Sequence, residues 1–124
     1  MTMVLHVWVG VAGLLGVPVA SLMWMAPEEA AAQLGIAATG PLGLASIRAD
    51  MGGFFGAGGV FALAASFKSS GGLLLALVVL VGLALAGRLV AVAVNGFVSE
   101  MGPPLVIEVV LCLVFAAGWR PLPR

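Results

Sequence analysis

The sequence predicts an all-α polytopic membrane protein, a bundle of four transmembrane helices with a short interfacial helix between the first two. The chain of 124 residues is 63% hydrophobic and only 8% charged, whereas a soluble domain has about 25% charged residues. Four long apolar segments also follow one another, separated by clusters of Gly, Pro and Ser. These segments are too long, and alternate too little, for the strands of a membrane β-barrel.

The four predicted spans make residues 1–124 a single membrane domain. They occupy roughly residues 4–25, 44–67, 72–94 and 104–119. A membrane span needs about 20 mainly apolar residues, so the fourth lies near the lower limit of about 17. The first span lacks the basic start of a signal peptide, and its apolar core is longer than the usual length of about 7–15 residues, so we expect it to be retained.

The breaks between the spans predict how the helices connect. The break at residues 69–72 is short, so the second and third spans should form an antiparallel hairpin. The longest connection contains P-E-E-A-A-A-Q-L-G-I, in which Pro27 suits the first turn of a helix and Glu28 and Glu29 suit its positive end. Gly35 suits the end of that helix. A short helix at the membrane interface is therefore expected, although the same residues also fit an ordinary polar connection.

Composition excludes several classes of function. Five basic and five acidic residues balance each other, and no basic run is present to bind nucleic acid. A single cysteine, Cys112, and a single histidine, His6, provide neither a redox pair nor a set of soft metal ligands. No Ser or Cys stands in a pattern that would pair it with an activating base. We therefore predict a non-enzymatic protein without a catalytic residue, metal, cofactor or nucleic-acid partner.

Loop charges predict the orientation of the chain in the membrane. With four spans, the side that holds both termini carries Lys68, Arg120 and Arg124, and the loops on the other side carry only acidic residues. Basic loops stay in the cytoplasm, so both termini should be cytoplasmic. Arg48 and Arg88 lie near the opposite ends of their helices, which weakens the bias and leaves dual insertion open.

Five polar residues are predicted to form one cluster at a shared depth near the outer face: Arg48, Asp50, Arg88, Asn95 and Glu108. An unpaired charge in hydrocarbon costs at least about 2.5–3.5 kcal/mol, so we expect all four charges to face inward and pair. Arg48 and Asp50 are two residues apart on a helix and do not face each other. The preferred pairs are Asp50 with Arg88 and Arg48 with Glu108, and the swapped pairing stays open.

Small residues are predicted to let the helices approach closely around this cluster. Glycines four residues apart allow close packing of helices in lipid. The second span carries a stripe of them, and the first span carries a matching stripe. The predicted packing residues are Gly10, Gly13, Gly52, Gly53, Gly56 and Gly59.

The stretch I-R-A-D-M-G-G-F-F at residues 47–55, with Arg88 downstream and Glu108 in the last span, resembles an uncharacterised bacterial family of small four-helix integral membrane proteins. That family, a domain of unknown function, has an I-R-A-D-x-G-G motif, a later G-R pair and an acidic residue in its last helix. The resemblance implies a multi-pass protein of the bacterial inner membrane. It implies no reaction.

Three functions fit these observations. The charged cluster can bind a lipid or other amphiphile, or it can dock the protein as a subunit of a larger membrane complex. The alternative is a small homodimeric transporter or channel that uses Asp50 or Glu108. A purely structural role, in which the charges lock four helices together, is also compatible with the sequence. Membrane lipids and a second copy of the chain are the expected partners.

Overall fold

The computed structural model describes residues 1–120 and contains four helices long and apolar enough to cross a membrane. These helices span Met3–Met25, Gly40–Lys68, Gly71–Asn95 and Ser99–Trp119. Residues 1–120 contain no β-strand. The predicted all-α polytopic architecture is therefore confirmed. Arg124, one of the basic residues used to predict orientation, lies outside the described residues.

The second long helix has three parts: α3 (Gly40–Ser46), the π-helical segment η1 (Ile47–Met51) and α4 (Gly52–Lys68). It begins four residues before the predicted boundary at residue 44. Gly40-Pro41 starts this helix instead of preceding it, because proline tolerates the first helical turn, where its missing N–H leaves no bond unmade. The I-R-A-D-M stretch forms the whole of the π-helical segment.

The remaining helices begin and end at residues with suitable capping chemistry. In α1 (Met3–Met25) the Thr2 side chain accepts a hydrogen bond from the Leu5 N–H at 3.4 Å. Ser69, at φ +49°, ends α4, and the Ser70 hydroxyl accepts from the Leu73 N–H at 3.3 Å to begin α5 (Gly71–Asn95). These two serines make the short turn of the predicted hairpin.

The connections at the other end of the molecule contain two short helical segments. The segment α2 (Pro27–Ala32) follows α1 and starts at Pro27, where the sequence placed a short helix. Gly35, at φ +72°, lies just beyond it. Gly96, at φ +84°, ends α5, and η2 (Ser99–Met101) then leads into α6 (Gly102–Trp119). Two prolines in the first turn of α6 allow it to begin before residue 104.

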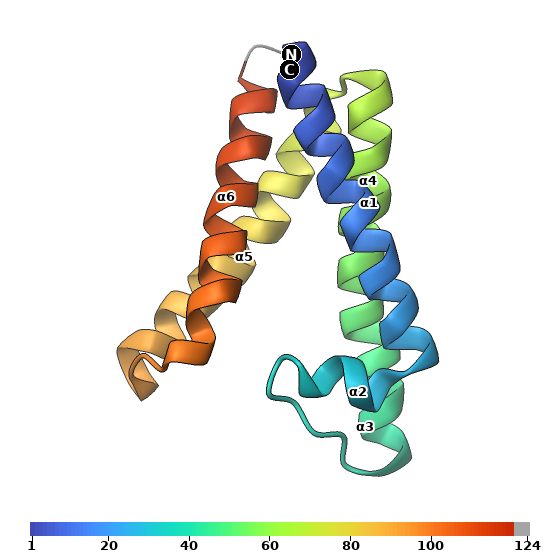
Figure 1. The fold of residues 1–124 in the computed structure, drawn as a ribbon, viewed down its shortest axis with the longest axis vertical. Helices are drawn as coiled ribbons and strands as arrows, with labels where there is room; N and C mark the ends of the chain where they lie inside the picture. Colours follow the sequence, from blue (N-terminus) through green and yellow to red (C-terminus); the bar gives the residue numbers. More distant parts are fainter. Residues whose placement is uncertain (121–124) are drawn as a thin grey trace.

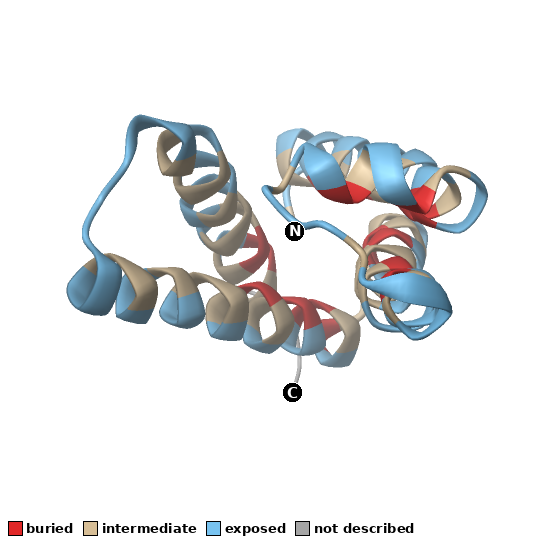
Figure 2. Cartoon of the chain, turned by 90° about the horizontal axis from the view of Figure 1, so that it is seen from below, coloured by how far each residue is buried: buried red, intermediate tan, exposed pale blue. Residues whose placement is uncertain are grey.

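The four long helices form two pairs that are arranged as an inverted V (Figure 1). One pair is α1 with α4, and the other is α5 with α6; these are the two most extensive helix contacts. The pairs meet at the end that holds the N-terminus and the last turn of α6, where a Cβ on Gly118 would lie 2.9 Å from the Met1 sulfur. Viewed from the open end, the two pairs stand apart (Figure 2). The bundle therefore closes at one end only.

The buried apolar residues form two clusters, one at the closed end of the V and one on the α1–α4 leg. The larger one lies where all four long helices meet, and the smaller one joins the far end of α1 to α2 and η1. The larger cluster contains Val9, Ala62, Ala65, Leu74, Leu77, Val81 and Phe115. The smaller cluster contains Met23, Ala31 and Ile47. Among the described residues, the α5–α6 pair contributes only to the larger cluster, so no buried apolar cluster joins the two pairs at their open end.

Glycines bring α1 and α4 into backbone contact. A Cβ on Gly59 would lie 2.8 Å from the Val17 nitrogen, and one on Gly13 would lie 2.7 Å from the Leu63 nitrogen. A Cβ on Gly10 would lie 2.9 Å from the Ser66 hydroxyl oxygen, whereas one on Gly56 would make only an ordinary contact with Ala20, at 3.5 Å. Gly53 lies outside this contact, because nothing lies within 4 Å of its Cβ position.

Candidate functional site

A cleft of about 860 Å³ occupies the space between the two helix pairs. Both pairs contribute to its walls, and so does the connection after α2. Its lining includes the apolar residues Leu77, Val81 and Phe115 and the charged residues Asp50, Arg88, Glu100 and Glu108. The cleft therefore follows directly from the V-shaped arrangement of the helices (Figure 1).

The polarity of the cleft changes along its length. At the closed end its lining includes Leu77, Val81 and Phe115, which belong to the larger apolar cluster. Toward the open end it is lined by charged residues on both pairs: Asp50 on η1 and Arg88, Glu100 and Glu108 on the α5–α6 pair. An apolar body with a few convergent polar groups is the usual composition of a binding site for a small molecule.

Arg88 and Glu108 form an ion pair within the α5–α6 pair. The Arg88 Nε donates to Glu108 Oε1 at 2.6 Å, and the two side chains are 35% and 14% exposed. Such a charge-assisted hydrogen bond is short and strong. The other carboxylate oxygen of Glu108, Oε2, is buried and has no hydrogen-bond partner among residues 1–120. The wall of the cleft therefore contains an arginine and a glutamate whose charges offset each other.

The preferred pairing of Asp50 with Arg88 and of Arg48 with Glu108 is wrong. Arg88 instead bonds Glu108, which belongs to the swapped pairing, and Arg48 bonds the main chain of α1. The physical reason is the packing of the helices: α5 packs on α6, while η1 packs on the α1 side of the molecule. Arg88 and Glu108 are therefore neighbours, and Arg48 and Asp50 belong to the opposite leg of the V.

Arg48 and Trp24 form a reciprocal pair of hydrogen bonds. The Arg48 Nε donates to the Trp24 carbonyl at 3.0 Å, and the Trp24 indole Nε1 donates to the Arg48 carbonyl at 3.0 Å. The Trp24 carbonyl lies in the last turn of α1, where helical carbonyls lack intrahelical partners and a cation is favourable. We call these two residues the Trp24–Arg48 clasp.

The π-helical segment explains how the Arg48 carbonyl can accept the indole. In an α-helix the Gly52 N–H would bond to the Arg48 carbonyl. Here it bonds to the carbonyls of Ala49 and Ile47 instead. Gly52 also leaves room for the ring, since a Cβ there would overlap the Trp24 Nε1 and lie 2.7 Å from its Cδ1. The I-R-A-D-M-G stretch is thus shaped to receive Trp24.

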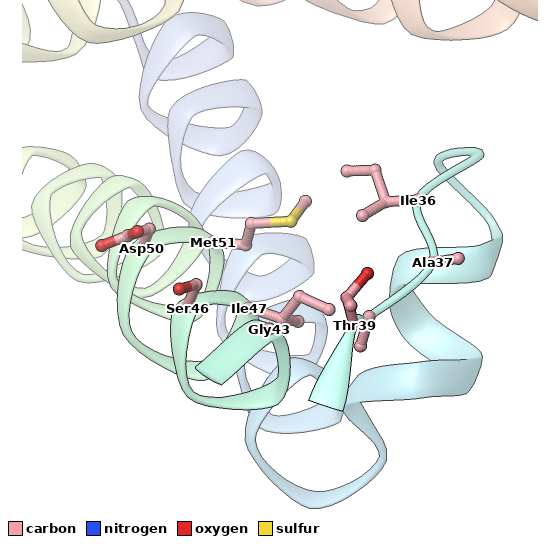
Figure 3. Close-up of a pocket in the computed structure, with 9 residues that line it drawn as sticks. Ile36, Ala37, Thr39, Gly43, Ser46, Ile47, Asp50 and Met51 are labelled. Atoms are coloured by element: carbon pink, nitrogen blue, oxygen red, sulfur yellow. The ribbon is translucent and has the colours of Figure 1, made fainter. Parts of the chain in front are cut away.

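Asp50 is exposed and lies where two hollows join. It lines the cleft and also a smaller hollow of about 340 Å³ beside residues 36–39, and Ile36 and Met51 line both. Figure 3 shows Met51 and Ile36 facing each other across the smaller hollow, with the Asp50 carboxylate directed away from them. Within the described part of the chain, the Asp50 carboxylate makes no hydrogen bond or ion pair.

The expectation of one cluster of five residues whose four charges face inward is therefore corrected. Arg48, Asp50 and Asn95 are all exposed. Asp50, Arg88 and Glu108 line one cleft, while Arg48 is held in the clasp and Asn95 ends α5 without lining the cleft. A cluster at a shared depth was predicted from helix positions alone, which do not show that the two helix pairs separate toward this end.

Sequence reasoning missed two residues that the structure places at this site. Trp24 is not among the predicted site residues, and no pattern in the sequence shows that its indole meets Arg48. Glu100 is not among them either, yet it lines the cleft. Its position just before the prolines that begin the last span is the signal that places it at the start of that helix. Within residues 1–120, no group of three or more His, Cys, Asp or Glu side chains is arranged to hold a metal ion.

Comparisons with protein-family models, with curated proteins and with solved structures find no match for the chain. The resemblance to the family with the I-R-A-D-x-G-G motif therefore stays a prediction. The site is a cleft between two helix pairs, apolar at its closed end and charged at its open end.

Proposed function

We propose that this is a non-enzymatic membrane protein that binds a lipid or other amphiphile in the cleft between its two helix pairs. The apolar closed end receives the tail, and the charged open end receives the headgroup. The observation that carries the proposal is the change from apolar to charged lining within one hollow. Its volume of about 860 Å³ is within the range of about 300–1,000 Å³ for small-molecule sites.

The alternative functions draw less support from the geometry. A homodimeric transporter or channel would use Asp50 or Glu108 as its working carboxylate. Glu108 is already bonded to Arg88, and the larger apolar cluster closes the cleft at the far end. Docking into a larger membrane complex would place a partner helix in the cleft instead of an amphiphile, and the test below distinguishes the two.

A bulky residue inside the cleft is expected to prevent amphiphile binding. Gly87 lines the cleft, and nothing lies within 4 Å of its Cβ position, so a side chain can be added there and Gly87→Trp introduces an indole at the wall of the cleft. Gly82→Trp is the matched control, since Gly82 is on the same helix, is equally open and does not line the cleft. Native mass spectrometry of the proteins in mild detergent should show retained lipid on the Gly82→Trp protein and a loss of at least about tenfold on the Gly87→Trp protein.

Equal lipid retention by the two variants would contradict the proposal, because lipid would then bind outside the cleft. Loss of a copurifying protein subunit from the Gly87→Trp variant alone would favour docking into a complex. Circular dichroism melting of both variants checks that each one folds.

We further propose that the protein lies in the bacterial inner membrane with both termini in the cytoplasm, which places the open end of the cleft at the outer face. In a Cys112→Ala background, Glu29→Cys should react with a membrane-impermeant maleimide in intact cells, and Lys68→Cys should react only after lysis. Both positions are exposed. Reaction of both from the same side would contradict the four-span topology, and reaction of each from both sides would establish dual insertion.

A further inference from the structure

We infer that the ligand of the cleft is a cationic amphiphile, an apolar body with an ammonium group, and that Asp50 and Glu100 recognise the positive group. This inference rests on the proposed function and deepens it. Among the described residues, the charged side chains that line the cleft are Asp50, Glu100, Glu108 and Arg88. Three carboxylates and one guanidinium leave the lining with an excess of two negative charges.

Arg88, the one cation in the lining among residues 1–120, is already neutralised. Arg88 donates its Nε to Glu108 Oε1 at 2.6 Å, so these two charges offset each other. The other intramembrane arginine, Arg48, is absent from the lining, because the Trp24–Arg48 clasp bonds its Nε to the Trp24 carbonyl at the end of α1. The clasp therefore keeps this positive charge out of the cleft, and Asp50, two residues away, has no cationic partner within residues 1–120.

The two uncompensated carboxylates lie on opposite legs of the V. Asp50 is on η1, on the α1–α4 leg, and Glu100 is on η2, where α5 connects to α6 (Figure 1). The Glu100 carboxylate accepts a 3.3 Å hydrogen bond from the neighbouring Ser99 hydroxyl. Both residues line the same cleft, so each of its two walls carries a carboxylate that can attract a positive group.

Aromatic rings next to Asp50 add a second attraction for a cation. Phe54 and Phe55 line the cleft and pack edge to face, with ring centroids 5.3 Å apart and an interplanar angle of 85°. Phe54 follows Asp50 by four residues, about one helical turn. Ring faces attract cations, and substituted ammonium ligands are bound by combinations of carboxylates and aromatic rings. An anionic headgroup would instead meet two uncompensated carboxylates and a guanidinium that is already bonded.

The experiment compares three probes that share one tail: dodecyltrimethylammonium, dodecyl maltoside and dodecyl sulfate. Binding to the full chain in phosphatidylcholine nanodiscs is measured by calorimetry below the micelle concentration, with empty nanodiscs subtracted. Binding in the cleft is defined as the part that Gly87→Trp abolishes and Gly82→Trp retains. We expect the cationic probe to bind in the cleft at least about tenfold more tightly than the neutral one, since tenfold is a modest preference for two carboxylates acting together. The anionic probe should show no binding in the cleft.

Removing the carboxylates should reduce this preference. Asp50→Asn should weaken binding of the cationic probe about two- to fivefold, and the double variant Asp50→Asn/Glu100→Gln about tenfold, because each exposed charge pair contributes modestly. Binding of the neutral probe should not change. Glu28→Gln/Glu29→Gln is the matched control, since these carboxylates are exposed and do not line the cleft. Added salt should weaken binding of the cationic probe only.

The outcomes separate this inference from the proposed function. If both the neutral and the cationic probes bind in the cleft with equal affinity, or if the double variant binds the cationic probe like the parent, the inference is wrong and the proposed function stands. If no probe shows binding that depends on Gly87, both are wrong. Because Asp50 and Glu100 are exposed, their neutral replacements should leave the fold unchanged, and a melting curve for each variant verifies this.

Discussion

Glu108→Gln is expected to lower the free energy of unfolding in detergent by about 2 kcal/mol, less than the roughly 3–5 kcal/mol of a fully buried ion pair, because the Arg88 side chain is 35% exposed. The substitution keeps the shape of the side chain but leaves the partly buried Arg88 guanidinium without its anion. An arginine without a partner in a membrane-spanning helix is costly, even where it is partly exposed in a cleft. Unfolding followed by circular dichroism as denaturant is added measures the change. Glu29→Gln, an exposed carboxylate on α2, is the control and should change stability by less than about 0.5 kcal/mol.

The double variant Arg88→Gln/Glu108→Gln completes a mutant cycle. Its loss in the free energy of unfolding should be about 1–3 kcal/mol smaller than the sum of the losses from the two single substitutions, because no unpaired charge remains. If the losses in the free energy of unfolding from the two single substitutions simply add in the double variant, the two side chains joined by the 2.6 Å contact are not energetically coupled and the pair is misassigned. The double variant also separates two roles of the pair. If stability returns and amphiphile binding is unchanged, the pair is a structural lock; if binding is lost, the pair belongs to the site.

Gly59→Leu is expected to destabilise the protein by about 3 kcal/mol or more, at the upper end of the range for overpacked sites. A Cβ at residue 59 would lie 2.8 Å from the Val17 nitrogen and 3.0 Å from the Gly16 carbonyl carbon. These are backbone atoms, which cannot rotate away as a side chain can. The helix pair α1–α4 must therefore separate to admit the new side chain, and the unfolding transition in detergent should shift accordingly.

Gly82→Leu is the matched control for this substitution. Gly82 is also a mid-helix glycine, but nothing lies within 4 Å of its Cβ position. Its replacement should leave the free energy of unfolding unchanged or raise it by up to about 1 kcal/mol, because leucine is a better helix former than glycine. Equal losses from the two variants would show that the cost reflects glycine itself and not the close contact between α1 and α4.

Most of the fold could be predicted from the sequence because its signals are local. Long apolar segments with so little charge leave helices in lipid as the favourable arrangement, since every backbone polar group must be satisfied inside the segment. The short helix at Pro27 and the turn at Ser69-Ser70 follow from capping and turn preferences of the same residues. The boundary of the second span was late at residue 44, because Pro41 permits a helix to start where the sequence suggested a break.

The candidate site could be predicted only in part. An unpaired charge is costly in lipid because it loses its hydration, so the sequence indicates that Arg88 and Glu108 need partners, and in the structure they bond each other. The pairing of the charges depends on the packing of α5 on α6 and on the π-helical segment. Neither feature has a local signal in the sequence. The sequence by itself therefore determined four apolar helices and the need to pair their charges. The tertiary structure alone decided that the helices separate into a V, that Trp24 binds Arg48, and that Asp50 and Glu100 line a shared cleft, because these relations join residues from helices distant in the chain.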